Sequence, residues 1–303
     1  MTKKKLNINL LVKCEKRFSG KKWYNDERRE ALLGRLEYLN DDETNLILDL
    51  TDRFRFLGLN EVYSELSNAF KKIPVSIFNG VNKILFAPLK SPYNKEEEKK
   101  KKRGLSNGHI MASKSKSCDL IFGLMRIEYP ARYMQPYKDK IKICDEPKDI
   151  LDNYTQNSLI VLWDDFVGSG DTAFNAIADL QKFLYDEKGI KTLEKNFAIV
   201  CMAAMREGID ILNYCMLKCY ASDVYIKAIS DDQRFNQKQI EARISYMKSA
   251  ETKVLKKSAK NFSLGYKQSE ALVSILDKCP NNTFPFYWFD SKYQLNPVFY
   301  RRK

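Results

Sequence analysis

Residues 158–184, SLIVLWDDFVGSGDTAFNAIADLQKFL, decide the fold of this chain. The stretch opens with an apolar run over 159–163, which is typical of a strand buried on both faces of a parallel sheet. Two adjacent carboxylates, Asp164 and Asp165, come next, and small residues follow at 168–170. The remainder carries apolar residues at helical spacing. The sequence therefore predicts a strand, an acidic pair, a small-residue loop and a helix in direct succession.

The small-residue loop has the composition of a phosphate-binding site. Gly168 and Gly170 can adopt positive φ, and they let backbone N–H groups approach an anion without a Cβ in the way. The hydroxyl groups of Ser169 and Thr172 can donate hydrogen bonds to the same phosphate, and Asp171 lies at the expected start of the helix. A helix N-terminus adds a favourable field for an anion.

The acidic pair suits the sugar of a sugar phosphate. The carboxylates of Asp164 and Asp165 can accept hydrogen bonds from sugar hydroxyls, or hold Mg²⁺ through water, because hard cations prefer oxygen ligands. A ribose that carries one phosphate therefore fits the pair and the loop together. The alternative is an acidic turn between a strand and a capped helix, without a ligand.

The pattern Asp-Asp-x-x-x-Ser-Gly-x-Thr over 164–172 resembles the phosphoribosyl-pyrophosphate (PRPP) motif of type I phosphoribosyltransferases. In that family the two acids contact the 2′ and 3′ hydroxyls of the ribose, and the loop surrounds its 5′-phosphate. The resemblance implies that Asp164 and Asp165 are catalytic residues and Mg²⁺ ligands, and that 168–172 bind the phosphate. Asp171 departs from the family pattern, in which Gly or Lys is usual, and places a negative charge near the expected phosphate.

Upstream, residues 83–88, KILFAP, predict a short buried strand, and a strongly charged stretch follows it. The family has a pyrophosphate-contacting turn and then a mobile basic loop in this order, both before the acidic pair. The resemblance makes Lys90 the candidate catalytic residue of the turn, and Lys102 and Arg103 the candidates for a lid. A plain surface insertion is the alternative for this stretch.

Further apolar runs at 197–204 and 223–230, separated by helical patterns, predict an α/β fold with a mostly parallel sheet flanked by helices. Ligands in such sheets bind at the carboxyl ends of strands, where we also expect the turn at 230–232. A helical pattern extends over 46–73. The predicted organisation is a helical N-terminal layer at 1–73, a phosphoribosyltransferase-like core at 74–230, a basic insertion at 231–264, and a C-terminal strand with an aromatic hood at 265–303 that belongs to the core.

The C-terminal segment 265–288 contains Gly-Tyr, a short apolar run, Pro-Asn-Asn-Thr and an aromatic cluster that ends on Trp. This succession resembles phosphoribosyltransferase-like proteins of bacterial conflict systems, including some encoded beside retron reverse transcriptases. In the superfamily a hood beside the sheet selects the nucleobase. By analogy, Asn281 and Asn282 are candidates for hydrogen bonds to a base on which the aromatic rings stack. A packed tail is the alternative.

The formal net charge of +13 favours a polyanionic partner, either a nucleic acid or a phosphorylated substrate. Lysines crowd the second half of the insertion, and Lys253, Lys256 and Lys257 are the candidates for contact with a nucleic-acid backbone. A solvated helix face is the alternative. One histidine and an odd number of cysteines, seven, disfavour a Ser/His/Asp nucleophile set, a zinc site and a disulfide framework. No apolar run is long enough to span a membrane, and the spread of the seven cysteines indicates reduced intracellular thiols, so we expect a cytoplasmic protein without a membrane partner.

Together these observations predict a phosphoribosyltransferase-like enzyme that binds PRPP or a nucleotide with Mg²⁺. The resemblance to conflict-system proteins implies a toxic effector of antiphage defence. The alternative is a non-catalytic sensor of PRPP or nucleotides, or a nucleic-acid-binding partner in a defence complex such as a retron with its reverse transcriptase. A salvage enzyme for a free base is a third interpretation. The sequence does not indicate the oligomeric state.

Overall fold

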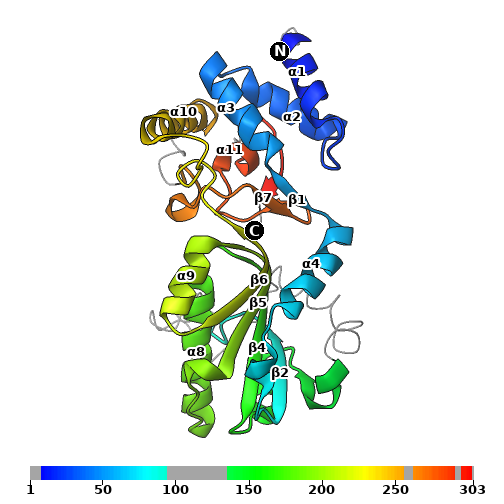
Figure 1. The fold of residues 1–303 in the computed structure, drawn as a ribbon, viewed down its shortest axis with the longest axis vertical. Helices are drawn as coiled ribbons and strands as arrows, with labels where there is room; N and C mark the ends of the chain where they lie inside the picture. Colours follow the sequence, from blue (N-terminus) through cyan, green and yellow to red (C-terminus); the bar gives the residue numbers. More distant parts are fainter. Residues whose placement is uncertain (1–7, 94–134, 256–261, 291–294, 302–303) are drawn as a thin grey trace, which may run out of the picture. The chain divides into compact units, whose positions relative to one another are not determined.

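The computed structural model describes residues 8–93, 135–255, 262–290 and 295–301. The chain divides into two compact units, each with its own sheet (Figure 1). We call Tyr63–Val224 the central unit, and Met1–Val62 together with Tyr225–Lys303 the terminal unit. None of the helices in the described ranges combines the length and the apolar character that a membrane span requires.

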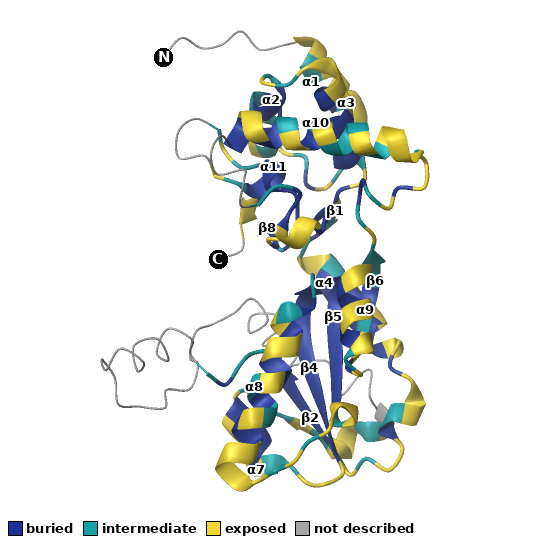
Figure 2. Cartoon of the chain, turned by 90° about the vertical axis from the view of Figure 1, so that its left-hand side faces the viewer, coloured by how far each residue is buried: buried dark blue, intermediate teal, exposed yellow. Residues whose placement is uncertain are grey.

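A five-stranded sheet forms the centre of the central unit, with its strands in the order β3-β2-β4-β5-β6. The strands are β2 Lys83–Pro88, β3 Ile141–Ile143, β4 Ser158–Val167, β5 Phe197–Met205 and β6 Lys218–Tyr225. The pairs β2–β3, β2–β4 and β4–β5 are parallel. Every residue of β4 and β5 is buried (Figure 2), which explains the long apolar runs in their sequences. The predicted α/β fold with a parallel sheet is therefore confirmed.

Helices lie on both sides of this sheet, with α8 and α9 on one side and α4 on the other (Figure 1). The helices are α4 Leu59–Lys71, α7 Pro147–Asn153, α8 Asp171–Lys188 and α9 Arg206–Tyr214. Side chains alternate along a strand, so Ile160 and Leu162 of β4 share one buried cluster with the apolar faces of α8 and α9. The neighbouring Trp163 is stacked against Phe70 of α4, with 6.1 Å between the ring centroids.

The terminal unit combines helices from both ends of the chain with a four-stranded sheet, in the order β1-β7-β8-β9. Its helices are α1 Ile8–Phe18, α2 Asp26–Leu36, α3 Asp41–Asp52, α10 Gln237–Leu255 and the short α11 Pro285–Trp288. Its strands are β1 Arg55–Leu57, β7 Val273–Ile275, β8 Lys278–Cys279 and β9 Tyr300–Arg301. Because β1 pairs in parallel with β7, the sheet joins the N-terminal and C-terminal parts of the chain.

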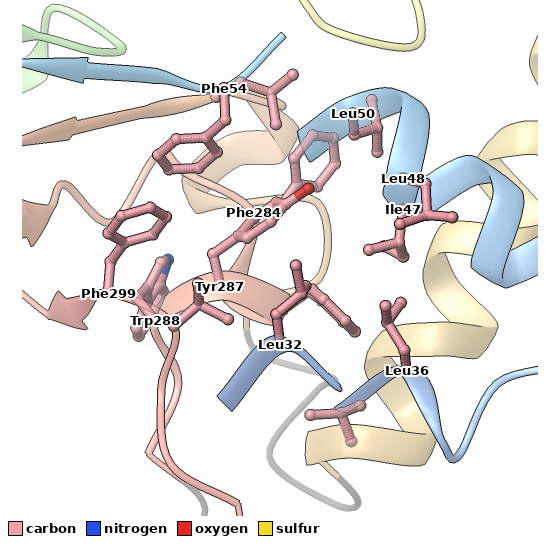
Figure 3. Close-up of a cluster of buried hydrophobic side chains, with 14 of the residues drawn as sticks. Leu32, Leu36, Ile47, Leu48, Leu50, Phe54, Phe284, Tyr287, Trp288 and Phe299 are labelled. Carbon is pink, nitrogen blue, oxygen red and sulfur yellow. The ribbon is translucent and has the colours of Figure 1, made fainter. Parts of the chain in front are cut away.

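The C-terminal aromatic residues form part of the core of the terminal unit (Figure 3). The rings of Phe284, Tyr287 and Trp288 are at most 1% exposed and pack with apolar side chains of α2 and α3. Residues 265–303 were expected to belong with the parallel sheet, whereas the described part of this segment groups with the N-terminal helices. The packed tail, which the sequence analysis kept as an alternative, describes these aromatic residues.

Two predicted elements have different bounds in the structure. The helical pattern over 46–73 is divided into α3 and α4 by β1, because Arg55–Leu57 pair with a strand far along the chain. The strand expected at 223–230 is shifted to Lys218–Tyr225. The turn at 230–232 belongs to the terminal unit, where the Ser230 backbone N–H donates to the carboxylate of Glu270 at 2.8 Å.

Candidate active site

The acidic pair and the small-residue loop lie at the carboxyl edge of the five-stranded sheet. Along the chain, β2 is followed by its neighbour β3, whereas β4 is followed by β5 on its other side. The direction of winding therefore reverses between β2 and β4. In open α/β sheets, ligands bind at such a switch point, outside the carboxyl ends of the strands. The topology thus places the expected ligand site at the end of β4.

The acidic pair is buried within β4. The strand continues to Val167, so Asp164 and Asp165 belong to the strand, whereas the sequence analysis placed them after it. Their side chains are in the buried class, and Asp164, at 9% exposed, is the more accessible of the two. The backbone N–H of Asp165 donates to Oδ1 of Asp164 at 2.9 Å. Because side chains alternate along a strand, Asp164 follows Leu162 onto one face of the sheet and Asp165 follows Trp163 onto the other. Each carboxylate can offer oxygen atoms to a cation or to ligand hydroxyls at the end of the strand.

The loop after β4 leads directly into α8. Gly170 has φ +81° and precedes Asp171, the first residue of the helix, so the left-handed conformation that glycine favours is in use here. Gly170 supplies no side-chain cap, an arrangement that leaves first-turn N–H groups for an anion. The Ser169 hydroxyl donates to Oδ2 of Asp171 at 3.0 Å. The Ser169 hydroxyl, which was expected to bind phosphate, therefore contacts the carboxylate of Asp171 in this structure.

Helix α9 packs against this loop through its backbone. A Cβ atom on Gly208 would lie only 1.9 Å from the carbonyl oxygen of Gly168, and one on Gly170 would lie 3.1 Å from the carbonyl oxygen of Gly208. Such contact requires glycine, and it fixes the loop against the first turn of α9. Gly208 was not among the residues predicted from the sequence. The available signal was a glycine shortly after a buried strand, at the same edge of the sheet.

Lys90 lies close to the acidic pair in the register of the sheet. Strands β2 and β4 run side by side up to the end of β2, beyond which the Leu89 N–H donates to the carbonyl oxygen of Trp163 at 2.7 Å. Lys90 is the next residue and is half-buried. The Ser91 hydroxyl then donates to Oδ2 of Asp179 on α8 at 2.6 Å, which fastens the segment after β2 to that helix.

A thiol pair lies beside the acidic residues. Cys201 of β5 is the register partner of Asp164, and its Sγ lies 4.0 Å from that of Cys219 on β6. Burial, then the hydrogen bond and charge of Cys219, then the two aspartates raise the pKa of Cys201 well above its ordinary value. The Cys201 thiol is therefore protonated at neutral pH and is a poor nucleophile.

The family model described as PRTase-CE matches residues 30–301. The chain belongs to the PRTase-CE family. The family name indicates a phosphoribosyltransferase-like protein, in agreement with the resemblance of the motif at 164–172. The match spans both compact units of this PRTase-CE chain. No curated protein and no solved structure matches it at a significant level.

The remaining candidate residues of this PRTase-CE chain lie elsewhere. Asn281 and Asn282 belong to the terminal unit, and the buried Asn282 amide donates to Oγ of Ser269 at 2.8 Å. That contact occupies a donor that the sequence analysis assigned to a base. The candidates Lys102, Arg103, Lys256 and Lys257 lie outside the described residues.

Lys253 of α10 has a structural partner. Its ammonium group donates to both carboxylate oxygens of Glu43, at 2.7 Å each, and Glu43 is 1% exposed. Burial opposes ionisation of Glu43, but hydrogen bonds from Lys253 and Ser249 outweigh it and hold the pKa of this carboxyl below its usual value. A phosphate at Lys253 would have to compete with this ion pair, so the structure gives the lysine a stabilising role that the charge pattern did not reveal.

The acidic pair of this PRTase-CE chain fits Mg²⁺ only with help from a ligand. Within the described ranges, no three or more His, Cys, Asp or Glu side chains are grouped to hold a metal ion. Asp164 and Asp165 would leave most coordination positions to water and to phosphate oxygens, which is the usual mode of Mg²⁺ binding. A carboxylate at this strand end therefore suits an ion that arrives with a phosphorylated ligand.

Proposed function

We propose that this protein binds PRPP, or another phosphorylated ribose, at residues 164–172 and acts as a phosphoribosyltransferase-like enzyme. One observation supports this most: a single segment carries a buried acidic pair and a glycine-serine loop at the switch point of a parallel sheet. In this proposal, Asp164 and Asp165 face the ribose hydroxyls. The loop and the first turn of α8 hold the 5′-phosphate.

Transfer from PRPP would break the bond between C1 of the ribose and the pyrophosphate oxygen, and would form a bond from C1 to the acceptor. Positive charge develops at C1 as the leaving group departs, and the carboxylates of Asp164 and Asp165 would stabilise it in a site of low polarity. Lys90 would bind the departing pyrophosphate. Mg²⁺, when bound, supplies further neutralisation of the pyrophosphate charge. Catalysis would rest on positioning and electrostatics.

Pyrophosphate release from PRPP and Mg²⁺, with nucleobases, nucleotides or nucleic acids offered as acceptors, tests this proposal. We expect Asp165→Asn to reduce the rate by about 100-fold or more, because it removes a charge next to the reacting carbon. The matched control is Asp186→Asn, which neutralises an aspartate that is 45% exposed toward the far end of α8. Equal rates for Asp165→Asn and the wild type would show that the acidic pair has no catalytic role.

A second candidate function is a sensor that binds a phosphorylated ribose without turnover. The sequence after β2 favours it, because residues 89–91, Leu-Lys-Ser, carry no recognisable pyrophosphate turn, the feature that separates a transferase from a sensor. Binding of PRPP that stabilises the protein against heat, without pyrophosphate release for any acceptor, would identify the sensor.

We also propose that the protein acts in bacterial antiphage defence, as a toxic effector or as a partner of nucleic acid or a reverse transcriptase in a retron-like complex. The support is the resemblance of residues 265–288 to conflict-system proteins, and the cytoplasm is the location that this role requires. Cells that carry the gene with its neighbours should resist phage, and cells with Asp165→Asn should lose that resistance. Plaque counts on the two strains measure the difference.

A further inference from the structure

Two of the segments at the proposed phosphate site carry more acidic than basic residues, and Lys90 after β2 is a further basic residue at this edge of the sheet. In residues 164–172 and 206–208, which contribute the loop and the first turn of α9, there are four acidic residues and one basic residue. The acidic residues are Asp164, Asp165, Asp171 and Glu207, and the basic residue is Arg206. A phosphate dianion in the loop would lie near the carboxylate of Asp171, so a further cation beside the loop would favour its binding.

The structure places Arg206 beside the loop. It is the first residue of α9, and Gly208 in the same turn is the residue whose backbone contacts Gly168 and Gly170. Side chains on a helix lean toward its N-terminus. For α9 that end follows β5 at the carboxyl edge of the sheet, where the loop lies.

The side chain of Arg206 also has no partner within the described ranges. Its side chain is exposed, and among the described residues it makes no ion pair, hydrogen bond or ring contact. Arg35 and Arg243, by contrast, bind backbone carbonyls and Asp49 respectively. A guanidinium group binds phosphate oxygens through two parallel N–H donors, which makes arginine well suited to this role.

We propose that Arg206 binds the phosphate of the ligand held by residues 168–172 and offsets the charge of Asp171. The inference rests on the proposed function, because it assumes a phosphorylated ribose in the loop. In this arrangement the phosphate is held from two helices, by N–H groups of α8 and by the guanidinium group of Arg206 on α9. The expected ligands are therefore riboses that carry a 5′-phosphate. The 5′-phosphate is then required for binding of the ligand.

Calorimetric titration with ribose 5-phosphate in about 0.15 M salt, where the Debye length is about 8 Å, tests this role. We expect Arg206→Gln to weaken binding roughly 10- to 100-fold, the range for a charge-assisted hydrogen-bond pair. The matched control is Lys195→Gln, which removes the same charge from an exposed residue just before β5, at the opposite end of that strand. The control should change the dissociation constant less than about twofold, because a distant exposed charge is screened.

A second substitution separates a local contact from a general loss of charge. Asp171→Asn should strengthen binding in the wild-type background and restore part of the affinity lost in Arg206→Gln, because the two side chains act on the same phosphate. If the wild type binds ribose 5-phosphate and Arg206→Gln binds it equally well, the role of Arg206 is overturned and the proposed function stands. If the wild type binds neither ribose 5-phosphate nor PRPP with Mg²⁺, both are overturned.

Discussion

Glu251 of α10 is a carboxyl group enclosed in the core of the terminal unit. It is 0% exposed, and its Oε2 accepts hydrogen bonds from the Ser263 hydroxyl and the Leu264 N–H, at 2.7 and 3.0 Å. Its Oε1 is buried without a hydrogen-bond partner among the described residues. Burial, with a smaller contribution from the charge of Glu270, raises the pKa of Glu251 to about 8. The side chain is therefore mostly protonated at pH 7 in the folded protein.

This protonation makes stability depend on pH in a definite direction. Unfolded chains release the proton near the ordinary pKa of 4.5, so across the window from 4.5 to about 8 the folded state binds more protons than the unfolded state. The stability contributed by Glu251 is complete below that window and is lost as the pH rises through it. We expect the free energy of unfolding, measured with urea, to fall by up to about 1.4 kcal/mol per pH unit between pH 5 and 8.

Glu251→Gln should flatten this slope, because an amide does not titrate. Glu241→Gln, at an exposed position of the same helix, should leave the slope as it is. A wild-type protein whose stability is constant from pH 5 to 8 would contradict the assignment.

At the scale of elements, the backbone contact between α9 and the loop leads to a prediction about ligand binding. Gly208→Ala would place a methyl group against the carbonyl oxygen of Gly168, so the loop or the helix must move. We expect the affinity for ribose 5-phosphate to fall by about tenfold or more, with a loss of stability of about 1–3 kcal/mol from overpacking. Calorimetry and thermal unfolding measure the two effects.

The control for Gly208→Ala is Gly189→Ala, at the C-terminus of α8. Gly189 has φ +63°, and a Cβ there would meet no described atom within 4 Å. This substitution should cost about 1 kcal/mol of stability through backbone strain and should leave the affinity unchanged. Gly208→Ala with the affinity of the wild type would show that the loop does not depend on α9.

Elements specified by local pattern were predictable from the sequence. The segment from β4 to α8 was predicted because an apolar run, a glycine turn and a helical period all lie within it, and β2 was predicted from its own apolar run. The site residues on this segment are neighbours along the chain, so their proximity follows from covalent connection.

Elements specified by distant contacts were not predictable. β1 is only three residues long and exists because it pairs with β7, which no local period reveals. The aromatic residues at 284–288 and Lys253 have no local pattern that separates core from surface, and only the packed structure shows that the rings are core and that the lysine neutralises Glu43. Arg206 and Gly208 likewise join the site only because β5 is the neighbour of β4.

At the scale of the whole molecule, the terminal unit is built from both ends of the chain and the central unit is one continuous segment. Arg35 of α2 joins the two ends within the terminal unit. It is 0% exposed and donates to backbone carbonyl oxygens of Phe286, Phe289 and Asn296, at 2.6, 2.6 and 2.9 Å. Burial lowers the pKa of this guanidinium group to about 10, which leaves it charged at pH 7.

We expect Arg35→Lys to destabilise the terminal unit selectively, by about 2–3 kcal/mol, because an ammonium group cannot reach several fixed carbonyl oxygens as the guanidinium fork does. Hydrogen exchange followed by mass spectrometry resolves the units: exchange should rise in α2, α3 and α10 and stay constant in β4 and β5. Arg29→Lys, at a 30% exposed position of the same helix, is the control. Binding of ribose 5-phosphate should instead slow hydrogen exchange in β4 and α8 and leave exchange in α10 unchanged.

If Arg35→Lys raised the exchange rate equally in both units, the two units would unfold together as one cooperative body.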